Sequence, residues 1–246
     1  MGILRIENLN KNFGGLSAVR NVHLEFHEKE LCSVIGPNGA GKTTFFKMIM
    51  GLLPPTSGRI FFKNRDITNL PTHKISRLGI CQTFQILSIF PNLTAMENIR
   101  IAAQSMSKYN FDFLNPALKY RELQQQAQEI INDVHLTGRE SLFAKNLSYG
   151  EKRRLEIGIT LARDPDLILL DEPTAGMARD EIIDTIRLIQ KISKRKTILM
   201  VEHNIDVVFS LSSRIVVLNR GEVIGDGSPK QIQEDEKVQK AYLGGI

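Results

Sequence analysis

The stretch GPNGAGKTT, residues 36–44, constrains the fold of this chain more than any other part of the sequence. It follows the apolar run ELCSVIG, which predicts a buried strand, and it opens KTTFFKMIMGL, which predicts a helix. Glycines at such a junction let backbone N–H groups close around phosphate oxygens, and the helix that follows adds its positive N-terminal end. The segment therefore predicts a phosphate-binding loop between a strand and a helix.

This loop supplies a first set of candidate binding residues. Lys42 is expected to reach the β- and γ-phosphates of a nucleotide, and the hydroxyl of Thr43 is placed to ligate Mg²⁺. The other expected phosphate contacts are Gly36, Asn38, Gly39, Ala40, Gly41 and Thr44. A glycine-rich turn with a surface lysine is the alternative, but the strand before the loop and the helix after it favour the phosphate site.

The segment DLILLDEP, residues 166–173, ends an apolar strand in two carboxylates, Asp171 and Glu172. Two adjacent acids at such a place are costly unless they face a cation or a water that must be activated. We expect Asp171 to support Mg²⁺ through its water shell and Glu172 to act as the general base for an attacking water. A solvated acidic turn is the alternative.

Two more polar residues follow predicted strands. Gln85 ends GICQTFQ, where its amide could touch the metal or the water, although Gln82 is a near neighbour and either could be a surface residue. His203 ends KTILMVEH and could hydrogen-bond a γ-phosphate. Taken alone, a histidine at the end of a strand is more often structural.

The alternation of strand and helix patterns predicts an α/β fold with a mostly parallel core sheet covered on both faces. One of the helix patterns, RDEIIDTIRLIQKISK, carries Ile182, Ile186 and Ile189 on one face. Near the N-terminus, ILRIENL and VHLEFHE alternate apolar and polar residues, and GRIFFKNRDI has the same character. These three runs predict an antiparallel β subdomain.

The middle of the chain is polar and helical in pattern, with Ala127, Ile130, Ile131 and Val134 near the spacing of one helical face. We predict a single domain, 1–246, in which 1–86 and 158–246 form the α/β core with its antiparallel part. The segment 87–157 would be an inserted helical subdomain.

Composition excludes several classes of protein. Hydrophobic residues make up 42% and charged residues 24%, as in globular proteins able to bury a core. The 32 basic and 27 acidic residues give a net charge of +5, which is far from the dense basic clustering of a nucleic-acid binder. No segment approaches about 18 continuous apolar residues, so a membrane role must come through partners. Cys32 and Cys81 lie in apolar surroundings and predict core thiols in a reducing compartment.

The motifs together resemble those of ABC-transporter ATP-binding subunits over essentially the whole chain. GPNGAGKTT resembles their Walker A motif, LSYGE their signature motif, LILLDE their Walker B motif and AGMA their D-loop. Gln85 matches the Q-loop glutamine, His203 the switch histidine, and Phe13 the aromatic residue that stacks on adenine. The resemblance implies an ATPase of the P-loop class that binds ATP and Mg²⁺, with Gln85 a metal ligand and Lys42, Gln85, Glu172 and His203 the catalytic residues.

The resemblance also implies partners. In a head-to-tail dimer with a second ATPase subunit, a copy or a paralogue, Ser148 and the N–H of Gly150 would contact the γ-phosphate held by the partner. Transmembrane permeases would bind the dimer at the cytoplasmic face of a bacterial-type inner membrane, with a solute-binding protein as an indirect partner and no nucleic acid. One departure is Ala178, where many relatives have Asp or Asn, which puts the contact of the D-loop with the partner in question.

Finer features point to one branch of the family. TFQ, LSYGEKRRLEIG, EHN, GDGSPKQI and VQKAYLG are similar to the ATPases of importers for branched-chain amino acids, with urea and short-chain amide importers close behind. The lipopolysaccharide-export ATPase shares part of the tail. A non-transport ABC protein acting on nucleic acid or ribosomes is a further alternative, but such chains usually carry two ATPase halves or long coiled coils.

Overall fold

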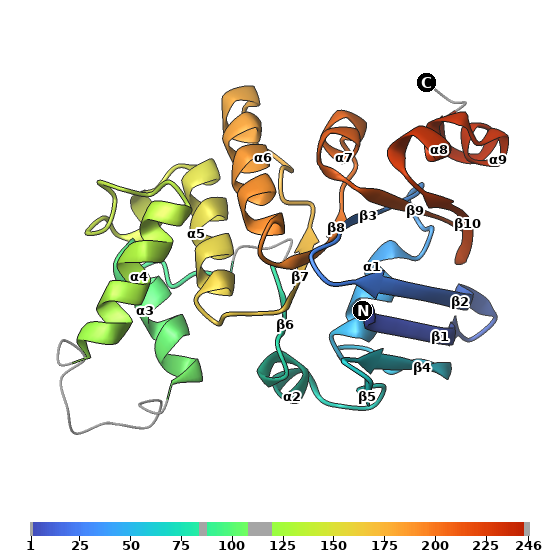
Figure 1. Ribbon diagram of the computed structural model, residues 1–246, viewed down its shortest axis with the longest axis horizontal. Helices are drawn as coiled ribbons and strands as arrows, with labels where there is room; N and C mark the ends of the chain where they lie inside the picture. Colours follow the sequence, from blue (N-terminus) through green and yellow to red (C-terminus); the bar gives the residue numbers. More distant parts are fainter. Residues whose placement is uncertain (1, 84–87, 108–119, 244–246) are drawn as a thin grey trace.

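The computed structural model describes residues 2–83, 88–107 and 120–243. A six-stranded sheet lies at the centre of the molecule (Figure 1), in the order β10-β9-β3-β8-β7-β6. Its strands are β3 (Leu31–Ile35), β6 (Ile80–Gln82), β7 (Leu167–Asp171), β8 (Thr197–Val201), β9 (Arg214–Asn219) and β10 (Glu222–Gly227). Every neighbouring pair is parallel except β9 with β10. The predicted mostly parallel core sheet is confirmed.

The one antiparallel pair comes from the run RIVVLNRGEVIGDG, which forms a hairpin of two strands. Arg220 and Gly221 make the turn with positive φ angles of 49° and 85°. Such a pair matches the right-handed twist of the flanking strands, which explains why a two-residue connection suffices.

The central strands are buried on both sides, so alternate residues enter two different hydrophobic cores. Leu169 and Leu199 pack in one core with helix α1 (Lys42–Ile49), whereas their neighbours Ile168 and Ile198 pack in the other with α6 (Arg179–Ser193) and α7 (Ile205–Leu211). This double burial explains why β3, β7 and β8 are continuous apolar runs without polar alternation. In α6, Ile189 is fully buried, and Ile182 and Ile186 are partly buried against the second core.

A second sheet is antiparallel throughout, in the order β2-β1-β4-β5. It consists of β1 (Gly2–Phe13), β2 (Leu16–His27), β4 (Ser57–Phe62) and β5 (Arg65–Asp66), and its buried face joins the core that contains α1. Of the short helices, α2 (Thr72–Arg77) precedes β6. The helices α8 (Pro229–Glu234) and α9 (Glu236–Val238) pack against β9 and β10, and a π-helical turn follows at Gln239–Leu243. The predicted antiparallel part is confirmed.

The helices of the middle segment gather on the opposite side of the molecule from this sheet (Figure 1). They are α3 (Ala95–Met106), α4 (Arg121–Asp133), the 3₁₀ turn η2 (Ala144–Asn146) and α5 (Tyr149–Leu161). Ala127, Ile130, Ile131 and Val134 are buried, as their spacing predicted. Helix α5 continues beyond residue 157, and the boundaries 87–157 of an inserted subdomain stay a prediction.

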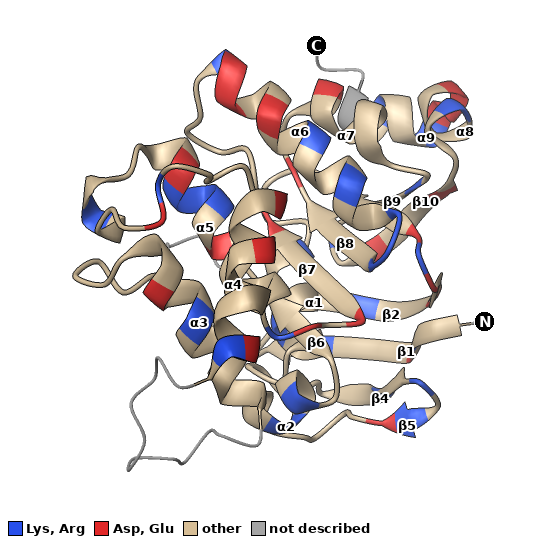
Figure 2. Ribbon diagram, turned by 60° about the vertical axis from the view of Figure 1, so that its left-hand side comes forward, with Lys and Arg blue, Asp and Glu red and all other residues tan. Residues whose placement is uncertain are grey.

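Charges on α6 follow the helix dipole. Asp180 and Glu181 lie in its first turn and Lys191 in its last, and Figure 2 shows acidic residues toward the start of the helix and basic ones toward its end.

Cys32 and Cys81 are free and buried, as predicted. Within the described ranges, no helix combines the length and the apolar character needed to cross a membrane.

Candidate nucleotide-binding site

The predicted phosphate-binding loop connects β3 to α1 and is packed tightly against its neighbours. Gly36 has a φ of +150°, and a Cβ there would collide with the carbonyl oxygen of Leu218 on β9. Gly41 has a φ of +103°, and a Cβ there would collide with the carbonyl oxygen of Ala18 on β2. Because only glycine fits both places, the two sheets hold the backbone of the loop in one shape.

Lys42 is folded onto this loop. Its ammonium donates hydrogen bonds to the carbonyl oxygens of Gly36, at 2.7 Å, and Pro37, at 3.1 Å. Burial lowers the pKa of Lys42, whereas the charges of Glu172 and Asp171 oppose that shift. A buried cation at the mouth of a helix that has no acid in its first turn is suited to an anionic ligand.

A cavity of about 350 Å³ opens beside the loop. It brings together residues that lie far apart in the sequence: Phe13, Leu16, Ala18, Asn38, Gly39, Ala40, Gly41, Lys42, Thr43, Thr44, Glu172, Val201 and His203. Phe13 is 48% exposed, which is unusual for an aromatic residue, and the ammonium of Lys11 lies 5.2 Å from the centroid of its ring. The cavity thus joins an aromatic surface at one end to a phosphate-binding loop at the other.

The two carboxylates predicted at the end of β7 take different positions. Glu172 lines the cavity, and its Oε1 lies 3.0 Å from Nε2 of His203. Asp171 is 8% exposed, and its burial together with the charge of Glu172 raises its pKa. The backbone N–H of Asp171 donates a hydrogen bond to the hydroxyl oxygen of Thr83, at 3.4 Å.

This carboxylate pair fits a divalent cation. A buried carboxylate beside a second one is unfavourable until positive charge is added, and the exposed hydroxyl of Thr43 lies across the same cavity from Glu172. No group of three His, Cys, Asp or Glu side chains among the described residues could hold a metal ion by itself. Mg²⁺ commonly uses one or two protein ligands and takes the rest from phosphate and water, so the donor set agrees with Mg²⁺.

Glu202 is a buried residue of the site that the sequence analysis missed. Its Oε1 accepts hydrogen bonds from the backbone N–H of Thr174, at 3.1 Å, and from the Thr174 hydroxyl. Its Oε2 accepts from the backbone N–H groups of His203, at 2.7 Å, and Asn204, at 3.2 Å. Glu202 therefore ties the segment that carries His203 to the turn that follows Glu172. The sequence did contain a signal for Glu202, because this acid directly follows the apolar run TILMV, just as Asp171 follows LILL.

The predicted signature residues do not line the cavity. Ser148 is the N-cap of α5, where its hydroxyl accepts from the N–H of Glu151 in a capping box. Ser148 and the N–H of Gly150 contact the carboxylate of Glu181. Gln85 lies outside the described residues.

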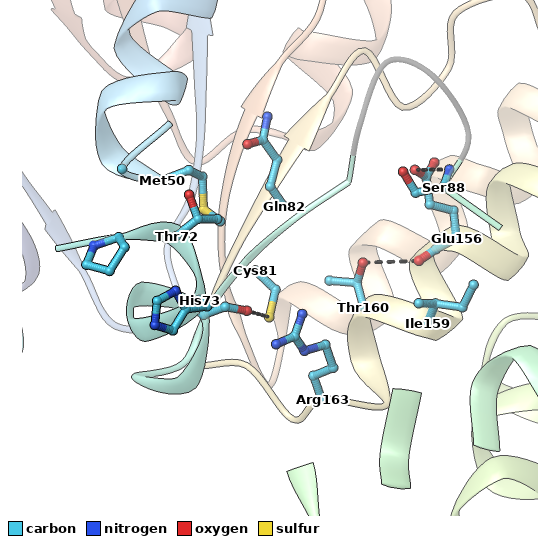
Figure 3. A pocket seen from close by; sticks show the side chains of 13 residues that line it. Met50, Thr72, His73, Cys81, Gln82, Ser88, Glu156, Ile159, Thr160 and Arg163 are labelled. Carbon is cyan, nitrogen blue, oxygen red and sulfur yellow. Dashed lines mark hydrogen bonds between the residues drawn. The ribbon is translucent and has the colours of Figure 1, made fainter. Parts of the chain in front are cut away.

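A second, larger cavity of about 700 Å³ lies between the α/β part and the helices of the middle segment. Figure 3 shows Thr72 and His73 of α2 on one side and Ile159 and Thr160 of α5 on the other. Its lining shares no residue with the cavity at the phosphate-binding loop. This groove had no counterpart in the sequence analysis.

The fold and the site define a P-loop ATPase: a glycine loop between strand and helix, with acids at the same edge of a mostly parallel sheet. The chain belongs to the ABC transporter family, whose model matches residues 19–175, and is an ATP-binding and ATP-hydrolysing subunit of that family. A second model, for the branched-chain amino acid ATP-binding cassette transporter, matches residues 222–245.

Similar proteins cover nearly the whole chain. The high-affinity branched-chain amino acid transport ATP-binding protein BraF of Pseudomonas aeruginosa is 41% identical, with 98% of each chain covered. The high-affinity branched-chain amino acid transport ATP-binding protein LivG of Salmonella typhimurium is 37% identical, with 98% of each chain covered. The lipopolysaccharide export system ATP-binding protein LptB of Acidithiobacillus ferridurans is 34% identical, covering 98% of this chain and 97% of its own.

Solved structures of ABC transporter cassettes have the same fold as this chain. A nucleotide-free ATP-binding cassette from an ABC transporter aligns with a TM-score of 0.85 at 30% identity, covering 98% of this chain and 99% of the other. A dimeric bacterial ABC transporter cassette aligns with a TM-score of 0.79 at 27% identity, covering 92% and 99%.

Proposed function

We propose that this chain powers the import of branched-chain amino acids through partner permeases. The observation that carries the proposal is the match of residues 222–245 to the family model for that class, which lies apart from the ATPase motifs. This C-terminal part is built into the fold, since Ile232 and Val238 are buried against β9. A relative named for the same transport, 41% identical, supports the assignment.

Uptake measurements test this proposal. Cells that encode the chain, with Lys42 replaced by Ala in the chromosomal copy, should lose high-affinity uptake of radiolabelled leucine, isoleucine and valine. Uptake of a solute of another class serves as the control. Unchanged uptake of all three amino acids, together with a defect in lipopolysaccharide export, would favour the class of the 34% identical relative instead.

We further propose that the working unit is a head-to-tail dimer of this chain with a second ATPase subunit. Each nucleotide would lie between the phosphate-binding loop of one subunit and Ser148 and Gly150 of the other. Two observations support this: the donors at the start of α5 lie outside the cavity of their own subunit, and a similar cassette is dimeric. Helix N-termini bind phosphate well, so α5 would add its positive end to the γ-phosphate.

Within such a site, each residue has a distinct task. Phe13 would stack on adenine, the loop 36–44 would bind the phosphates with Lys42, and Thr43, Asp171 and Gln85 would hold Mg²⁺, which neutralises phosphate charge when bound. Glu172 would accept a proton from the attacking water, and His203, 3.0 Å from it, would orient that carboxylate and contact the γ-phosphate.

We infer that the groove of Figure 3 receives the permease, which would place the chain at the cytoplasmic face of the membrane. The groove spans α2 and α5, so a segment seated there would sense a shift of the helices relative to the sheet. Ile159→Arg should leave nucleotide binding intact and abolish co-purification with the permeases. Equal recovery of permeases with the variant and the parent would contradict this placement.

A further inference from the structure

The donors at the start of α5 are already occupied in this chain. Oε1 of Glu181 accepts hydrogen bonds from the hydroxyl of Ser148 and from the N–H of Gly150, both at 3.2 Å. A Cβ at Gly150 would collide with this same oxygen, so the glycine permits the approach of an anion. A carboxylate therefore lies where the proposed dimer needs a phosphate.

No cation of the described part of the chain neutralises this carboxylate. Among the described residues, Glu181 forms no ion pair with a lysine, an arginine or a histidine. The donors that contact it are neutral: Ser148 and Gly150 on one oxygen, and the N–H of Ala178 on the other, at 3.2 Å. The positive ends of α5 and α6 both lie beside it, because Glu181 is in the first turn of α6. This is the environment of an anion-binding site.

We propose that Glu181 is an internal stand-in for the γ-phosphate of the partner's ATP, and that it leaves the start of α5 when the dimer closes. The inference rests on the composite site proposed above. A carboxylate and a phosphate cannot both accept from the same two donors, so each γ-phosphate must displace one Glu181. The donors of Ser148 and Gly150 are thereby kept hydrogen-bonded in the nucleotide-free subunit, and closure requires ATP to compete with the chain's own carboxylate.

The displacement also reaches the catalytic segment. The second oxygen of Glu181 accepts from the N–H of Ala178 at the end of the AGMA turn, and that turn begins three residues after Glu172. Departure of the carboxylate from Ser148 and Gly150 therefore removes the hydrogen bonds by which Glu181 joins the start of α5 to this turn. Arrival of the partner's phosphate is in this way linked to the position of the segment behind the catalytic base.

Dimer affinity tests the proposal. In the Glu172→Gln background, which should trap ATP-bound dimers, Glu181→Gln should tighten ATP-dependent dimerisation by about tenfold, because the charge-assisted hydrogen bonds that compete with ATP are weakened. Glutamine also caps helices at this position, so helix α6 is preserved. The control is Asp180→Asn, which removes a charge from the neighbouring exposed position and should leave the affinity unchanged. An affinity equal to or weaker than that of the Glu172→Gln parent would overturn the proposal, whereas the composite site would stand as long as that parent dimerises.

A second measurement does not depend on dimerisation. Inorganic phosphate is added to the nucleotide-free Glu181→Ala variant while the amide resonance of Gly150 is followed by NMR. A phosphate-dependent shift should appear in the variant and be absent from the unsubstituted chain at the same concentration. Equal shifts in both proteins would show that the carboxylate does not occupy the subsite, and would overturn the proposal even if the dimer does not form.

Discussion

Replacing Glu202 by Gln removes the charge from a side chain on which four hydrogen bonds converge. The carboxylate is 3% exposed, with one oxygen accepting from Thr174 and the other from the N–H groups of His203 and Asn204. A glutamine whose NH₂ group faces Thr174 can donate to the Thr174 hydroxyl, but it leaves the backbone N–H of Thr174 without an acceptor. Turned the other way, it leaves the N–H groups of His203 and Asn204 without an acceptor. At least one hydrogen bond to a charged group, worth about 1.5–3 kcal/mol before relaxation, is lost, and the other hydrogen bonds lose their charge assistance. We therefore expect a decrease of roughly 2–4 kcal/mol in the free energy of unfolding.

The assay is urea unfolding of the nucleotide-free protein, followed by far-UV circular dichroism. Glu28→Gln, in an exposed turn, is the matched control and should change the free energy of unfolding by less than about 0.5 kcal/mol. The ATPase rate should also fall by about tenfold, because the link from the backbone of His203 to the turn that follows Glu172 is weakened. A Glu202→Gln protein as stable as the control would show that the four contacts do not hold the site, and would refute this reasoning.

Three further substitutions test separate parts of the site. Lys42→Ala should abolish ATP binding measured by calorimetry, and an unchanged affinity would contradict the phosphate-binding role of the loop. Glu172→Gln should slow hydrolysis by roughly 10²-fold while ATP still binds, as expected for loss of a positioned general base; full turnover would remove Glu172 from that role. The pKa of Asp171 is raised in the folded protein by burial and by Glu172, so its ionised form opposes folding: this cost is absent below the ordinary pKa of an aspartate and complete above the raised one. Asp171→Asn should therefore raise the melting temperature at pH 7 without Mg²⁺. This gain should shrink as the pH falls toward the ordinary pKa of an aspartate, and a lower melting temperature of the variant at pH 7 would contradict the prediction.

The fold could be predicted from the sequence because its signals are local. The apolar runs of β3, β7 and β8 and the glycine loop after β3 each report their own conformation, and parallel strands bring their carboxyl ends to one edge. The cavity that joins Phe13, Lys42, Glu172 and His203 follows from that rule together with the order of the motifs.

The contacts of Glu181 and Glu202 could not be predicted in the same way. One oxygen of each carboxylate accepts from a segment about 30 residues away in the sequence, and no local pattern specifies that pairing. The groove of Figure 3 likewise depends on how α2 and α5 face each other across β6, which is a matter of tertiary packing.

If each nucleotide site is built from two subunits, two inactive variants with defects on opposite sides of the site should complement each other when they are mixed. Lys42→Ala loses the phosphate-binding loop, and Ser148→Arg should retain ATP binding but block the start of α5, so each variant alone should be inactive as an ATPase. A mixed dimer contains one intact site, made of Lys42 from the second variant and Ser148 from the first. We predict that mixing the purified variants restores a substantial fraction of the ATPase activity. Mixtures as inactive as the separate variants, in a chain whose unsubstituted form hydrolyses ATP, would contradict the composite site.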